Sequence, residues 1–87
     1  MHEAGLMRDL IEKVSAVVEE QQARRAVAIE IWLGALSHMS PEHFAEHFAT
    51  ASPGTPAEGA RIDIETSDDV SHPDAQDILL KSIEVET

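Results

Sequence analysis

The feature that most constrains the fold is the alternation of apolar residues in positions 27–33. Every second position carries an aliphatic side chain: Val27, Ile29, Ile31 and Leu33. The positions between them carry Ala28, Glu30 and Trp32. A period of two with β-branched residues predicts a strand with one buried face. Trp32 falls on the opposite face, where it either covers a neighbouring side chain or belongs to a protein contact surface.

A helix is predicted ahead of this strand, from Glu3 to about Gln22. Its apolar residues recur at helical spacing: Leu6, Met7, Leu10, Ile11, Val14, Val17 and Val18. This stripe is typical of an amphipathic helix that packs on a core. Glu3 suits the positive end of the helix dipole. We therefore expect the helix to begin almost at Met1 and to hold the first residues in a fixed position.

A second helix is predicted from Pro41 to about Ser52. Ser40 suits the N-cap, and Pro41 suits the first helical position because its missing N–H needs no partner there. Pro53 follows the expected end of the helix. Its buried stripe consists of Phe44, Phe48 and Ala51.

The last strand is predicted over residues 77–86 and contains a break in phase. Four of its aliphatic residues form two pairs of opposite parity: Ile78 and Leu80, then Ile83 and Val85. A regular strand cannot direct all four side chains to one face. One extra residue near Lys81 and Ser82 restores the match, so we predict a β-bulge there.

The elements follow one another in the order α-β-α-β-β, because residues 60–66 add a strand in which Ile62 and Ile64 face inward. This order predicts an α+β fold with two helices on one face of a small three-stranded mixed β-sheet. The second helix is long enough to serve as a right-handed crossover between parallel strands. The 87 residues suffice for a single domain, 1–87, with residues 67–76 as a polar surface connection.

Charge and composition exclude several classes of partner. The formal net charge is -11, which opposes binding to nucleic acid or to an anionic membrane surface. The chain has no cysteine, which rules out disulfides and thiolate metal sites. No apolar run reaches the roughly 20 residues of a membrane span, and the first residues do not resemble a signal peptide. We therefore expect a cytoplasmic protein that binds cations or a basic partner.

Met1-His2-Glu3 is the candidate metal site with the most specific chemistry. The Met1 amine, the His2 backbone nitrogen and the His2 imidazole can close fused chelate rings around one divalent ion. This requires that Met1 is retained, which we expect because His2 is bulky. The alternative is that His2 belongs to an ordinary solvated terminus.

The remaining histidines are His38, His43, His47 and His72. His43 and His47 are four positions apart on the second predicted helix, a spacing that can hold Zn(II) or Ni(II) between two imidazoles. The alternative for this pair is two polar side chains beside the Phe44 stripe. His38 lies in the connection before the helix, where it is either solvated or turned toward a distant site. His72 is expected to be solvated. No nucleophile, base and oxyanion arrangement is visible, so we do not expect an enzyme.

The chain resembles the HypA/HybF family of hydrogenase and urease nickel-incorporation proteins. The resemblance rests on several short motifs in family order: Met1-His2-Glu3 with Leu6, Ile31 with Leu33-Gly34-Ala35-Leu36-Ser37, Pro41-Glu42, Gly54-Thr55, Ala57-Glu58-Gly59-Ala60, Ile62 with Ile64-Glu65, and Leu80 to Glu86. Each motif is short, but together they extend over most of the chain.

The resemblance implies a nickel metallochaperone that delivers Ni(II) during maturation of [NiFe]-hydrogenase or urease. It implies nickel ligands at the Met1 amine, at His2 and at the Glu3 backbone or carboxylate. A further contact is expected in the connection before the second helix, where His38 is the candidate because Ser40 is a poor ligand. The implied partners are the nickel-delivery GTPase of the maturation system and the hydrogenase large subunit precursor.

One departure from the family is large. Relatives carry a zinc ribbon with two Cys-x-x-Cys pairs between the last two strands, whereas this chain has only residues 67–76 there and no cysteine. No structural zinc is therefore expected. The loss leaves an alternative open, in which the domain keeps the fold, binds no metal and serves as a protein-interaction scaffold in hydrogenase maturation. A homodimer through the uncovered sheet face also remains open.

Overall fold

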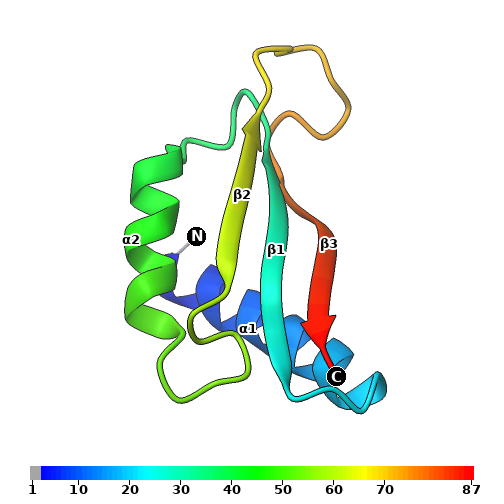
Figure 1. Cartoon of the computed structure of the whole chain (residues 1–87). Helices are drawn as coiled ribbons and strands as arrows, with labels where there is room; N and C mark the ends of the chain where they lie inside the picture. Colours follow the sequence, from blue (N-terminus) through cyan, green and yellow to red (C-terminus); the bar gives the residue numbers. More distant parts are fainter. Residues whose placement is uncertain (1–2) are drawn as a thin grey trace.

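The computed structural model describes residues 3–87, with side chains from Leu6 onward. The order of its elements is the predicted one: α1 (Glu3–Glu20), β1 (Arg25–Leu33), α2 (Pro41–Ala51), β2 (Arg61–Thr66) and β3 (Ile78–Glu86), as Figure 1 shows. Among these described residues, no helix is long and apolar enough to cross a membrane.

The sheet has the strand order β2-β1-β3, with the longest alternating run of the sequence at its centre. β1 pairs with β2 in parallel, so that Ile29 lies beside Ile62 and Ile31 beside Ile64. β3 pairs with the other edge of β1 in the antiparallel direction. The prediction of a mixed three-stranded sheet is confirmed, and α2 serves as the crossover between the parallel strands.

Both helices bury their apolar stripes in one core against the same face of β1. From α1 the core takes Met7, Leu10, Ile11, Val14 and Val18, and from α2 it takes Phe44 and Phe48. The strand supplies Ala26, Ile29, Ile31 and Leu33. The predicted two-layer arrangement, with both helices on one face of the sheet, is therefore confirmed.

The predicted bulge in β3 is present. Glu30 pairs with Ser82 and Ile31 pairs with Leu80, which leaves Lys81 as the extra residue. The phase change lets four aliphatic residues of β3 pack against the core: Ile78, Leu80, Ile83 and Val85.

A second irregularity, on β1, was not predicted. Ala26 pairs with Val85 and Ala28 pairs with Glu84, so Val27 is the extra residue of this strand. Ala26 is consequently fully buried in the core, while Val27 is half-buried outside it. The expectation that Val27 faces inward was wrong, because a bulge shifts every side chain beyond it to the other face.

The ends of the helices follow the local chemistry of the sequence. The Ser40 hydroxyl caps α2 by accepting a 3.1 Å hydrogen bond from the backbone N–H of His43. At the other end, the N–H of Ser52 donates to the Phe48 carbonyl at 2.9 Å. α1 ends at Glu20, two residues earlier than predicted, because Gln22 takes a left-handed conformation with φ 54°.

The connection between β2 and β3 folds over the end of the sheet beside the connection between β1 and α2 (Figure 1). The Gly34 N–H donates to the Asp77 carbonyl at 3.0 Å, and the Leu36 N–H donates to the Ala75 carbonyl at 2.7 Å. Any Cβ at Gly34 would clash with the backbone of Ala75. Glycine is therefore required where the two connections cross.

Candidate metal centre

The start of α1 lies where the sequence predicts it. α1 begins at Glu3, and Met7 and Leu10 fix its first turns in the core, with exposed fractions of 2% and 7%. Met1 and His2 lie outside the described residues, as does the side chain of Glu3. The proposed nickel ligands at these three positions therefore stay predictions.

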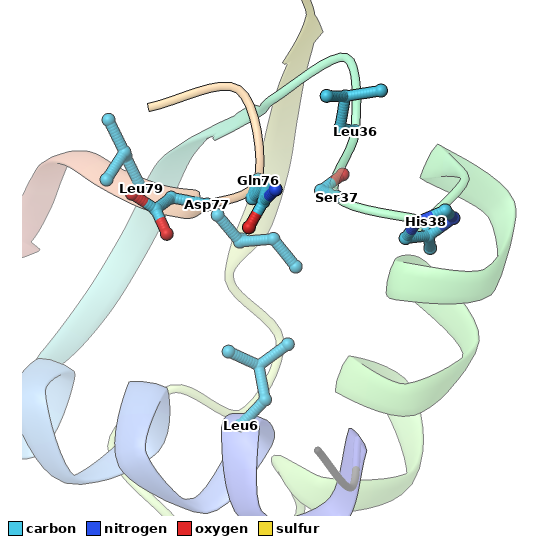
Figure 2. Close-up of a pocket in the computed structure, with 8 residues that line it drawn as sticks. Leu6, Leu36, Ser37, His38, Gln76, Asp77 and Leu79 are labelled. Carbon is cyan, nitrogen blue, oxygen red and sulfur yellow. The ribbon is translucent and has the colours of Figure 1, made fainter. Parts of the chain in front are cut away.

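An open hollow with a volume of about 650 Å³ adjoins the first turn of α1. Three segments far apart in the sequence line it, as Figure 2 shows: Leu6 from α1, Leu36 to His38 from the connection after β1, and Gln76 to Leu79 at the start of β3. Leu6 is three residues beyond Glu3, so this side of the hollow lies within one helical turn of the Glu3 backbone.

His38 lines this hollow and is exposed. Its backbone is left-handed, with φ 60°, a conformation that few residues other than glycine adopt. Histidine is among the residues enriched in this region, so the conformation fits the turn into the Ser40 cap as well as a ligand role. The exposed His38 side chain fits a solvated loop residue as well as a metal contact beside the hollow, so its role as a ligand stays a prediction.

Asp77 is the one carboxylate among the described residues that line the hollow. Sequence analysis did not single it out, since it stands at the end of an acidic connection and nothing in that pattern distinguishes it. Its backbone carbonyl accepts the hydrogen bond from Gly34, which keeps it beside the connection that carries His38.

His43 and His47 meet on α2. Their Nε2 atoms are 2.7 Å apart, and their ring planes are inclined by 14°. His43 is exposed and His47 is half-buried. The predicted sharing of one helix face is thus observed. Within residues 5–87 no set of three or more histidine, aspartate and glutamate side chains is arranged to hold a metal, so this pair and His38 do not form one cluster.

His72 and Trp32 lie together on the other face of the sheet. Their ring centroids are 4.9 Å apart, and Trp32 is only 9% exposed. The His72 Nδ1 atom accepts a 2.9 Å hydrogen bond from the backbone N–H of Asp74. The prediction that His72 is solvated was wrong, because the connection between β2 and β3 turns its ring onto Trp32.

The charged groups of the described residues form few fixed interactions. Arg25 and Glu86 pair across the strand ends at 2.6 Å, and Arg61 pairs with Asp63 at 3.0 Å, which raises the pKa of the Arg61 guanidinium. The Ser71 hydroxyl donates to Asp69 at 2.7 Å and lowers the pKa of that carboxyl. Most acidic groups are otherwise exposed. Together with the net charge of -11, they give the surface a negative potential that attracts cations.

Comparison with known proteins gives a consistent result. Residues 1–72 match the model of the HypA family, described as hydrogenase/urease nickel incorporation, metallochaperone. The hydrogenase maturation factor HypA of Deinococcus radiodurans is 40% identical over 65 residues, which are 75% of this chain and 54% of that protein. Its counterpart in Archaeoglobus fulgidus is 36% identical over 64 residues, 74% of this chain and 58% of that protein.

The fold also matches a solved structure. The solution structure of the Ni metallochaperone HypA from Helicobacter pylori is similar with a TM-score of 0.83 at 19% identity, over 99% of this chain and 98% of that one. At this identity the likeness concerns the fold alone. The sequence matches span little more than half the length of the curated relatives.

Proposed function

The chain belongs to the HypA family of hydrogenase and urease nickel-incorporation proteins, and from this premise we propose that it binds Ni(II) and delivers it to an enzyme under assembly. The family consists of metallochaperones, so no catalytic residue is assigned. The observation that carries the proposal is the family match over residues 1–72, which includes Met1-His2-Glu3.

The proposed ligands form a compact nitrogen-rich chelate. The Met1 amine, the His2 backbone nitrogen and the His2 imidazole supply three donors, and the Glu3 backbone or carboxylate supplies the next. Such donors favour square-planar Ni(II) or Cu(II). The amine has an ordinary pKa near 7.7–8.0 and has to lose its proton to bind. Affinity therefore rises with pH across neutrality.

The fold supports this site in two ways. α1 begins at Glu3 and is anchored by core residues within two turns, so the donors are attached to a rigid element. His38 lines the hollow that Leu6 also lines, which makes the imidazole available as a further contact. An open hollow beside the first turn of α1 suits a metal that is handed on, because a receiving protein can reach this end of the domain.

The proposal extends to partners and to zinc. The receiving proteins are the nickel-delivery GTPase and the hydrogenase large subunit precursor. Residues 1–87 act as one nickel-binding domain, and residues 67–76 stand in place of the zinc module. No structural zinc is required, because the connection between β2 and β3 is held by Gly34, Leu36 and the contact with Trp32.

Calorimetric titration of untagged protein with Ni(II) tests the proposal. His2→Ala and a variant with one added N-terminal residue should each lower the affinity by about tenfold or more, since both disrupt the chelate. The affinity of the unaltered protein should be higher at pH about 8.5 than at about 6.5. Equal affinity of all three proteins would overturn the N-terminal site.

The role of His38 is tested separately. His38→Asn and His38→Gly both remove the imidazole, and both residues accept the left-handed backbone. A smaller loss of affinity, shared by both variants, is expected if the imidazole contacts nickel. Unchanged affinity in both would remove His38 from the ligand set and leave the N-terminal chelate standing.

The interaction scaffold without metal is the second candidate. The hollow favours it, because Leu6, Leu36 and Leu79 give it an apolar wall and Leu36 is 38% exposed. Trp32 does not favour the scaffold, since His72 covers its ring and the ring is not free to form a protein contact. Sedimentation of the protein with and without Ni(II) separates the candidates: association with a partner, or with a second copy, that is indifferent to nickel favours the scaffold.

A further inference from the structure

The His43 and His47 rings on α2 have a geometry that suits metal binding. The distance between their centroids, 4.6 Å, exceeds the 2.7 Å between their Nε2 atoms. The two nearly parallel rings are therefore offset, so that their Nε2 atoms lie closer together than their centres do. The two Nε2 atoms are the groups with which an imidazole binds a metal.

We propose that His43 and His47 form a second metal site on α2, a two-imidazole chelate for a divalent cation such as Zn(II). It goes beyond the proposed nickel delivery and does not depend on the N-terminal ligands. Two metal–nitrogen bonds of about 2.0–2.1 Å place the nitrogens about 2.9–3.4 Å apart for angles between square and tetrahedral. The pair needs to open by only a few tenths of an ångström, which small side-chain rotations supply.

The pair changes tautomer when metal enters. With both rings neutral, one Nε2–H donates to the lone pair of the other Nε2. Metal binding moves that proton to the Nδ1 atom of the same ring, and both Nε2 lone pairs then face the ion. The cost is one exposed hydrogen bond, and the gain is two coordinate bonds.

The helix holds the two residues in this relation. They are separated by one turn of α2, whose first turn is fixed by the Ser40 cap. Phe44 and Phe48 follow the two histidines in sequence and are buried in the core. The backbone below the pair is therefore rigid, while His43 stays open to solvent.

The pair lies on a flank of α2 away from the loop that follows the helix. Ala49 follows Phe48 by one residue and lines a hollow with Pro53 and Gly59. His47 precedes Phe48 by one residue, and successive residues of a helix are about 100° apart. The histidines consequently face a different flank of the helix from Ala49.

The site offers two protein donors and leaves the other positions of the metal open. No third histidine, aspartate or glutamate joins the pair among residues 5–87. A closed structural site needs four ligands, whereas two imidazoles with water give a site that exchanges its metal quickly. Such a site suits transient loading of metal or a metal bridge to a donor on another molecule.

The experiment uses the untagged full chain carrying His2→Ala, titrated with Zn(II) and followed by NMR of the histidine ring signals. The His2→Ala change removes the proposed nickel chelate, so failure here and failure of the proposed function are distinguishable. Binding of one equivalent should shift the rings of His43 and His47 together. His43→Gln and His47→Gln should each lower the affinity by about tenfold or more, because either loss abolishes the chelate.

A matched control preserves the number of histidines. His47→Gln combined with Thr50→His places the second imidazole seven residues from His43, two turns away, and should not restore binding. His47→Gln combined with Glu46→His gives a spacing of three and should restore part of it. The inference is overturned if the two rings do not shift with Zn(II), or if the first double variant binds as well as the parent.

Discussion

The two faces of the sheet are covered by different means, although both contain buried side chains of β1. The face toward the helices carries Ile29, Ile31 and Leu33 under two amphipathic helices, in one continuous aliphatic core. The other face carries Trp32, which is covered at one end of the sheet by His72 from a short connection. Glu30 on this face is exposed and accepts a 3.0 Å hydrogen bond from the Ser82 hydroxyl.

This difference indicates that the face toward the helices maintains the fold, whereas the covering of the opposite face can vary. Burial of large apolar groups dominates stability, and it is concentrated on the helix side. Among the described residues, the opposite face buries Trp32 under His72, and backbone hydrogen bonds of Gly34 and Leu36 hold the connection in place. The connection that makes these contacts occupies the place of the zinc ribbon that the family resemblance implies. A change of this connection can therefore leave the core intact.

The largest effect is expected on the helix side. Phe44→Ala should lower the free energy of unfolding by about 3–5 kcal/mol, since Phe44 is fully buried between the helices and β1. Urea denaturation followed by circular dichroism measures it. Thr50→Ala, on the exposed side of the same helix, should change stability by no more than about 0.5 kcal/mol. Similar values for the two variants would contradict the assignment of the core.

A smaller effect is expected where the two connections cross. Gly34→Ala should cost about 1–3 kcal/mol, because the new Cβ overlaps the Ala75 backbone and the connection has to move. Thermal unfolding measures this loss. Gly5→Ala is the control: a Cβ there meets nothing within 4 Å, and the helix gains up to about 1 kcal/mol. Equal stability of both variants would show that Gly34 is not constrained.

The smallest effect is expected on the Trp32 contact. His72→Ala should lower the free energy of unfolding by about 0.5–1.5 kcal/mol and shift the Trp32 emission to longer wavelength as water reaches the ring. Trp32 is the sole tryptophan of the chain, so the emission reports on this contact alone. His72→Phe keeps a ring over Trp32 but loses the acceptor for the Asp74 N–H, and should keep the emission near that of the parent. A loss as large as that of Phe44→Ala would erase the contrast between the faces.

Much of the fold could be predicted because its signals are local. Three of these signals depend only on residues a few positions apart in the sequence. They are the apolar stripe from Leu6 to Val18, the alternation in residues 27–33, and the Ser40-Pro41 start of the second helix. The bulge at Lys81 was predictable for the same reason, since the phase change is visible within β3 itself. The bulge at Val27 could not be predicted, because it arises from the pairing of β1 with Val85 and Glu84, more than fifty residues away.

The same distinction between local signals and tertiary packing applies to the candidate site. Helical spacing alone brings His43 beside His47, and the order of donors alone makes Met1-His2-Glu3 a chelate. No sequence pattern could bring His38, Leu6 and Asp77 to one hollow, or turn His72 onto Trp32. Those contacts depend on how three segments meet at the end of the sheet. Sequence by itself determined the elements and their chemistry, because these follow from short-range geometry; tertiary structure decided which of them meet, because only packing around the shared core brings distant segments together.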